Sequence, residues 1–162
     1  SIAVSLRDLG MTMAPQNAFQ TLLGLETLSL RMKKHVSNAR KIANWLEQHP
    51  KIDKVTYAGL KSSKYYDLAK SVLPKGAGAL FTISLKEGYE ACIKMINNLN
   101  LFSHVSNLGD TRSLIIHPAS TVHRQLTEQQ QINAGLAPNV IRLSIGIEDP
   151  KDLIDDLKQA LE

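Results

Sequence analysis

Residues 140–161 read VIRLSIGIEDPKDLIDDLKQAL, and this stretch decides the fold class. In its first half Ile141 and Leu143 alternate with Arg142, so an extended chain would place the aliphatic side chains on one face and the guanidinium on the other. In its second half Asp149 followed by proline is typical of a helix start, and apolar residues then recur at steps of three and four. The stretch therefore predicts a largely buried strand followed directly by an amphipathic helix.

The same two periods alternate along the chain before this stretch. Apolar patterning and the loops between apolar runs predict strands over 55–57, 79–85, 102–105, 113–116 and 140–147, and helices over 63–72, 88–99, 126–134 and 149–161. Elements mixed in this way, with short connections, form an α+β domain. We expect a small, mostly antiparallel sheet with helices on one face.

The longest helical pattern runs over 16–49 and ends at His49, because the residue before a proline disfavours the helical conformation. About 30 residues at 1.5 Å each make a helix of about 45 Å, which is longer than a small domain is wide. One end of this helix is therefore expected to pack on something outside this chain, and Gly24 is the candidate for a bend or a junction. Residues 1–15 are predicted to be an irregular arm, and 50–162 to be the small domain.

Composition excludes several classes of protein. The 162 residues are 43% hydrophobic and 21% charged, as in a globular domain, and the single cysteine, Cys92, indicates a reducing compartment such as the cytoplasm. No apolar run approaches the roughly 18 residues that a membrane span needs. A net charge of +4 (19 − 15), with 5% aromatic residues, is too small an excess to indicate nucleic-acid binding.

Arg142 is the first candidate functional residue. A guanidinium on a central strand must be satisfied, since an unpaired buried charge costs several kcal/mol. Either a carboxylate of the protein pairs with it, or its face opens on a pocket in which a ligand carboxylate or phosphate binds the two parallel N–H donors. The residues alone leave both alternatives open.

Two loops are the next candidates. Asn107 begins the run Asn-Leu-Gly-Asp, which is either an ordinary turn or a turn that presents the Asn107 amide to a ligand. The loop 117–123, HPASTVH, is either a proline-stiffened connection or a binding loop. His104, His117 and His123 lie within twenty residues, but there is no H-E-x-x-H motif and no second cysteine, so we expect no metal site.

Basic residues crowd the long helix at Arg31, Lys33, Lys34, Arg40 and Lys41. Such a cluster is either a solvated helix face or a footprint for phosphate groups. No helix-turn-helix or RNP-like element accompanies it, which favours the solvated face and no nucleic-acid partner.

Eight short motifs, spread over almost the whole chain, carry a resemblance to a known family. They are 6–8 (LRD), 24–32 (GLETLSLRM), 65–70 (YYDLAK), 73–79 (LPKGAGA), 101–104 (LFSH), 107–110 (NLGD), 113–120 (SLIIHPAS) and 141–149 (IRLSIGIED). Through them the sequence resembles the C-terminal portion of O-acetylhomoserine sulfhydrylases, in the Cys/Met-metabolism family of pyridoxal-phosphate (PLP) enzymes. Asn107 and Arg112 favour the sulfhydrylase branch, because the lyase and synthase branches usually have Ser and Glu there.

The resemblance implies an aspartate-aminotransferase-like C-terminal domain from an enzyme of fold type I. In such enzymes a lysine of the large domain holds PLP as a Schiff base, and the cofactor is an electron sink for γ-replacement. Acetate leaves O-acetyl-L-homoserine, and sulfide or a thiol adds to give homocysteine or a thioether. Arg142, in the R-L-S-[IV]-G motif, is implied to grip the substrate α-carboxylate, and Asn107 to border it. The helix over 16–49 is implied to bridge the large and small domains.

By the same resemblance the chain covers about the last two-fifths of such an enzyme. The Schiff-base lysine and the phosphate-binding cup are implied to lie in the absent large domain, so no catalytic, cofactor-binding or metal residue is assigned here. The isolated chain is not expected to turn over, and the full-length enzyme is expected to be a cytoplasmic homo-oligomer. The alternative is a non-catalytic carboxylate-binding or interaction module derived from the same family.

Overall fold

The computed structural model describes residues 2–162, apart from the side chain of Glu128. The chain divides between Arg31 and Met32 into two compact units. In chain order its elements are α1 (Ile2–Leu9), α2 (Pro15–Glu26), α3 (Leu28–Glu47), β1 (Ile52–Thr56), α4 (Tyr66–Val72), β2 (Leu80–Leu85), α5 (Gly88–Asn98), β3 (Ser103–His104), β4 (Leu114–Ile116), α6 (Glu128–Asn133), β5 (Val140–Ser144) and α7 (Pro150–Leu161).

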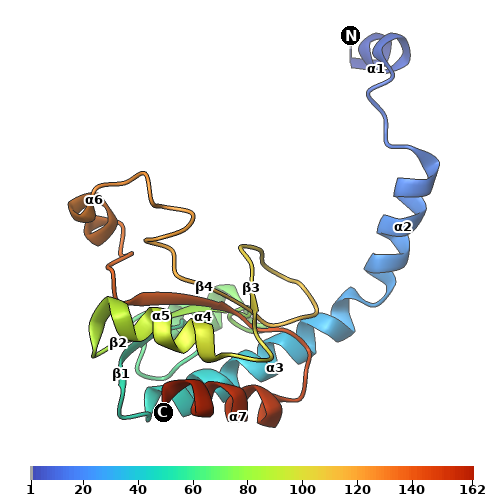
Figure 1. Ribbon diagram of the computed structural model, residues 1–162. Helices are drawn as coiled ribbons and strands as arrows, with labels where there is room; N and C mark the ends of the chain where they lie inside the picture. Colours follow the sequence, from blue (N-terminus) through green and yellow to red (C-terminus); the bar gives the residue numbers. More distant parts are fainter. Residues whose placement is uncertain (1) are drawn as a thin grey trace. The chain divides into compact units, whose positions relative to one another are not determined.

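The second unit is built on one five-stranded sheet, in the order β1-β2-β5-β4-β3 (Figure 1). β2 is antiparallel to β1 and to β5, and β5 is antiparallel to β4, whereas the short β3 runs parallel to β4. The predicted α+β class with a mostly antiparallel sheet is confirmed. β5, from the stretch that decided the fold class, is the central strand.

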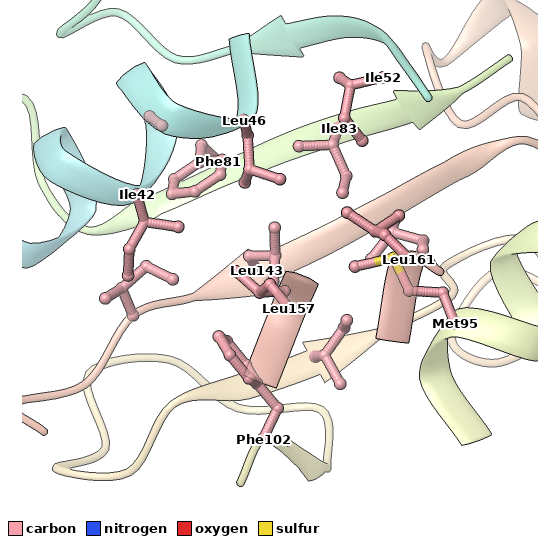
Figure 2. Packing of buried hydrophobic residues seen from close by; sticks show 14 of the residues in the cluster. Ile42, Leu46, Ile52, Phe81, Ile83, Met95, Phe102, Leu143, Leu157 and Leu161 are labelled. Carbon is pink, nitrogen blue, oxygen red and sulfur yellow. The ribbon is translucent and has the colours of Figure 1, made fainter. Parts of the chain in front are cut away.

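The hydrophobic core lies on one face of this sheet, under helices α3, α5 and α7 (Figure 2). Ile141 and Leu143 of β5 point into the core and are fully buried. Figure 2 shows Ile42 and Leu46 of α3 in the same cluster as Leu143 of β5 and Leu157 of α7. The helices on one face are therefore as predicted, and the opposite face of β5 is left to Arg142.

Helix α7 begins where the sequence predicts. The Asp149 carboxylate accepts the backbone N–H of Lys151 at 2.8 Å, and proline occupies the first helical turn. Two turns along, the buried carboxylate of Asp156 accepts the N–H groups of Asn100 at 2.9 Å and Leu101 at 2.8 Å. Helix α7 thereby holds the loop that follows α5.

The first unit departs from the predicted irregular arm. Ile2–Leu9 form α1, so 1–15 are not irregular throughout; Ser1 lies outside the described residues. None of the described helices is long and apolar enough to cross a bilayer.

The single helix predicted over 16–49 is instead two helices. The break is at Thr27 (φ −103°, ψ 1°), and Gly24, the candidate for a bend, lies inside α2. The Arg31 guanidinium donates to the Gly24 carbonyl oxygen at 2.6 Å and satisfies an acceptor that the end of α2 leaves open. The helical period of the sequence continues through the break, so periodicity alone does not reveal it.

Candidate functional site

Arg142 lies at the middle of the sheet, on the face opposite the core. In the strand register it is between Thr82 of β2 and Ile116 of β4. Its side chain is half-buried, whereas Ile141 and Leu143 on either side of it are fully buried on the other face. The packed face therefore fixes the backbone from which the guanidinium projects.

The guanidinium makes two long hydrogen bonds and no ion pair with a described carboxylate. Nη2 of Arg142 donates to Ser106 Oγ at 3.5 Å and to the Asn107 carbonyl oxygen at 3.4 Å, both beyond the usual range of hydrogen-bond lengths. Neither salt bridge formed by the described residues includes Arg142. Of the two alternatives left open by the sequence, this geometry favours a guanidinium that is available to an external carboxylate or phosphate.

Asn107 reaches Arg142 through its backbone and not through its amide. Its Oδ1 accepts the N–H of Leu108 at 2.9 Å, and Gly109 follows with φ +74°, a value that favours glycine. The Asn107 side chain is exposed. The structure thus brings the two predicted site residues together, with the Asn107 carbonyl oxygen as the point of contact.

The loop that carries Asn107 is anchored by a network that periodicity does not reveal. Glu148 accepts the backbone N–H of Ser113 at 2.6 Å and its hydroxyl at 2.9 Å, while Ser113 Oγ accepts the N–H of Gly146 at 2.9 Å. A Cβ on Gly146 would collide with the carbonyl oxygen of Thr111 and with the Glu148 carboxylate, so glycine is required there. The network joins the loop to the segment that follows β5.

Nearer the turn, an exposed arginine has the partner that Arg142 lacks. Arg112 donates to the Asp110 carboxylate at 3.1 Å. Hydrogen bonds from Arg112 lower the pKa of the Asp110 carboxyl, and the Asp110 carboxylate raises the pKa of the Arg112 guanidinium. Both groups are charged at neutral pH, and each neutralises the other.

Helix α3 supports the segment after β5 with two buried polar side chains. His35 Nδ1 donates to the carbonyl oxygen of Ile145 at 2.6 Å, and Asn38 Nδ2 donates to those of Gly146 and Glu148 at 3.1 and 2.8 Å. His35 falls on the apolar stripe of the helical pattern, and an asparagine one turn later on the same face is the sequence signal for this support. The second polar atom of each side chain, His35 Nε2 and Asn38 Oδ1, has no partner among the described residues.

The polar side chains of His117, Ser120 and Thr121 in the loop 117–123 form hydrogen bonds within the fold. His117 is buried, with Nε2 donating to the Pro138 carbonyl oxygen at 2.7 Å and Nδ1 accepting from the Ser120 hydroxyl at 2.8 Å. The Thr121 hydroxyl donates to the His117 carbonyl oxygen at 2.7 Å. These contacts favour a proline-stiffened connection. Across the described residues, no group of three or more His, Cys, Asp or Glu is arranged to hold a metal ion.

Comparison with known proteins places this geometry in a family. The profile of the family "Cys/Met metabolism PLP-dependent enzyme" matches residues 1–162. An O-acetyl-L-homoserine sulfhydrylase of Leptospira meyeri is 49% identical over 97% of this chain and 36% of its own length. An L-methionine gamma-lyase of Fusobacterium nucleatum is 42% identical over 98% of this chain and 40% of its own.

A solved structure has the same fold. The crystal structure of a protein of Campylobacter jejuni, assigned as an O-acetylhomoserine (thiol)-lyase, superimposes with a TM-score of 0.88 and is 48% identical; the match covers 96% of this chain and 37% of that one. The related structure contains a pyridoxyl-lysine phosphate. The chain therefore spans a little over one third of the length of the relatives it matches.

The residues around Arg142 do not by themselves form a PLP site. A site for this cofactor needs a lysine and a charged partner for the pyridine nitrogen. The residues that pair with or hydrogen-bond to Arg142 are Thr82, Ile116, Ser106 and Asn107, none of which is a lysine or an acid. These residues therefore do not supply the lysine that attaches this cofactor.

Proposed function

The chain belongs to the Cys/Met-metabolism family of PLP-dependent enzymes, and from this premise we propose that it is the C-terminal part of an O-acetylhomoserine sulfhydrylase. The complete enzyme exchanges the acetate of O-acetyl-L-homoserine for sulfide or a thiol. PLP, when bound by the rest of the enzyme, supplies the electron sink for that exchange. The part that this chain plays is to bind and orient the substrate.

We assign the binding of the substrate α-carboxylate to Arg142. One observation carries the assignment: a guanidinium rooted in the central strand has no described carboxylate partner. Its two long contacts to Ser106 and Asn107 use a single nitrogen, so further N–H donors remain for the two oxygens of a carboxylate. The rigid core face of β5 limits the movement of this fork, and a rigid fork holds the substrate in one orientation.

The test uses the protein translated from the complete reading frame that encodes these residues. Arg142→Gln is expected to lower kcat/KM for O-acetyl-L-homoserine by about 100-fold, because a charge-paired contact is lost at the carboxylate. Arg142→Lys keeps the charge but loses the two parallel N–H donors of the guanidinium. Its kcat/KM should therefore lie between that of the unaltered protein and that of Arg142→Gln. The matched control is Lys158→Gln on α7, which removes an equal charge from an exposed position and should leave kcat/KM unchanged.

The outcomes separate the two parts of the proposal. A complete protein that forms no homocysteine or thioether from O-acetyl-L-homoserine would refute the sulfhydrylase function. Activity that is retained in full by Arg142→Gln would leave the function standing and reject the carboxylate site.

The 162-residue chain alone is expected to give no product when PLP, O-acetyl-L-homoserine and sulfide are supplied. Turnover by this chain would contradict the proposal that the cofactor lysine lies elsewhere in the enzyme. A reading frame that encodes nothing before Ser1 would favour the non-catalytic module derived from the same family.

A further inference from the structure

A cavity of about 580 Å³ opens in the second unit, away from the residues that surround Arg142. Its walls are one face of α3, the Ala58–Gly59 turn, helix α4 and the loop 73–77. This volume falls within the range of about 300–1,000 Å³ that is usual for small-molecule sites. The proposed sulfhydrylase function makes no use of this cavity.

Five cationic side chains line the cavity. Three come from α3, namely Lys33, Arg40 and Lys41. Arg40 and Lys41 follow Lys33 by seven and eight residues, which is about two helical turns, so the three side chains share one side of the helix. Lys70 comes from α4 and Lys75 from the following loop. The sequence alone showed a basic stretch on one helix, whereas the fold adds two lysines from another part of the chain to the same hollow.

No described carboxylate lines this cavity, and neither salt bridge formed by the described residues involves the five cations. Like charges gathered around one cavity repel one another, and salt weakens this repulsion as their separation increases. An anion in the cavity would convert that repulsion into attraction. A single carboxylate would neutralise one of the five charges, whereas an anion with several negative charges would neutralise most of them.

The loop that supplies Lys75 is held against α3. Gly76 has φ +123°, and a Cβ at this residue would run into the side chain of Val36 on α3. The backbone of this loop therefore approaches the helix as closely as a glycine allows. This close approach fixes where Lys75 enters the cavity. The hydroxyl-bearing residues Ser37 and Tyr66 also line it and could donate to an oxyanion.

We propose that this cavity binds a small anion that carries two or more phosphate groups. Lysine is a common ligand of phosphate, and the five charges match a di- or triphosphate better than a monoanion. Either a nucleotide or an inorganic polyphosphate has this chemistry.

The test measures the binding of inorganic tripolyphosphate to the 162-residue chain by isothermal titration calorimetry in 150 mM salt. The double variant Arg40→Gln/Lys70→Gln is expected to bind at least tenfold more weakly. The control Lys151→Gln/Lys158→Gln removes two exposed charges from α7 and should bind within about twofold of the unaltered chain. Absence of saturable binding, or an equal loss in both double variants, would overturn the proposal.

A second measurement needs no substitution. On titration with tripolyphosphate, the largest changes in amide chemical shift are expected at Gly59, Gly76 and Ala77, which line the cavity. Changes centred on Arg142 instead would overturn the assignment to this cavity. ATP that binds at least tenfold more tightly than tripolyphosphate would identify a nucleotide, and equal affinities would identify the phosphate chain as the recognised group.

Discussion

The two faces of the central strand β5 differ in how completely their side chains are satisfied. On the core face, Ile141 and Leu143 are fully buried among apolar side chains of α3 and α7. On the opposite face, Arg142 is half-buried, with two long hydrogen bonds and no described acid. The first face therefore contributes stability, and the second carries a guanidinium that no described carboxylate neutralises.

Leu143→Ala is expected to cause the largest loss of stability, because it empties the centre of the core face. A Leu→Ala change at a fully buried site lowers the free energy of unfolding by about 2–5 kcal/mol. Denaturant unfolding followed by circular dichroism measures the loss. Leu80→Ala on the neighbouring strand is the control, since Leu80 is 42% exposed and should lose less than about 1 kcal/mol. Equal losses at the two positions would contradict the contrast between the faces.

Asp156→Ala is expected to cause the next largest loss of stability, because the Asp156 carboxylate is buried and hydrogen-bonded within the fold. Its carboxylate accepts backbone N–H groups from Asn100, Leu101 and Phe102. Removing it leaves these donors unsatisfied at an expected loss of about 1–3 kcal/mol in the free energy of unfolding. The same unfolding measurement on Asp155→Ala, which removes an equal charge from the exposed side of α7, should show little change. A loss in both variants would indicate a general effect of charge.

Asp156 also marks the limit of what the sequence predicts about the fold. The alternation in β5 and the cap at Asp149 are local patterns, and both predict the structure correctly. The partners of Asp156 are more than fifty residues away in sequence, so no local pattern announces them. The break at Thr27 shows a different limit. There a local pattern is present but misleading, because the apolar residues keep their helical spacing while the backbone leaves the helical conformation at Thr27.

The candidate site divides in the same way. Strand alternation alone places Arg142 on the face away from the core, and the structure agrees. The family resemblance predicts that Asn107 lies near Arg142. Neither strand alternation nor the resemblance predicts that the contact is made by the Asn107 carbonyl oxygen. The network of Ser113, Gly146 and Glu148 joins segments more than thirty residues apart, which is why spacing does not reveal it.

Cys92 gives the core face a pH dependence. Burial raises the pKa of the Cys92 thiol from 9.0 to about 12, because the thiolate is poorly solvated in the core. The unfolded chain releases this proton near pH 9 and the folded chain does not, so the stabilising effect is complete below pH 9 and is lost as pH rises toward 12. The free energy of unfolding should fall by about 1 kcal/mol between pH 8 and pH 10.

The control for this prediction is Cys92→Ala. This variant has no thiol, so its free energy of unfolding should lack the part of the decrease between pH 8 and pH 10 that Cys92 causes, while all other titrating groups are unchanged. The measurement is the difference between the two unfolding curves at pH 8 and at pH 10. Equal slopes in both proteins would contradict a buried, protonated thiol.

Arg142→Gln is expected to have the smallest effect on stability, and that small effect tests whether the guanidinium is paired within the fold. A guanidinium paired with an internal acid would leave the acid uncompensated when removed, and the free energy of unfolding would then fall by about 3–5 kcal/mol. Because no described carboxylate pairs with Arg142, and its two contacts at 3.4–3.5 Å are long, the change should stay within about 0.5 kcal/mol. Urea unfolding of the 162-residue chain measures it, with Leu143→Ala as the reference for the other face. A large loss would mean that the guanidinium is engaged within the fold, and it could then not be free to bind the carboxylate of a substrate.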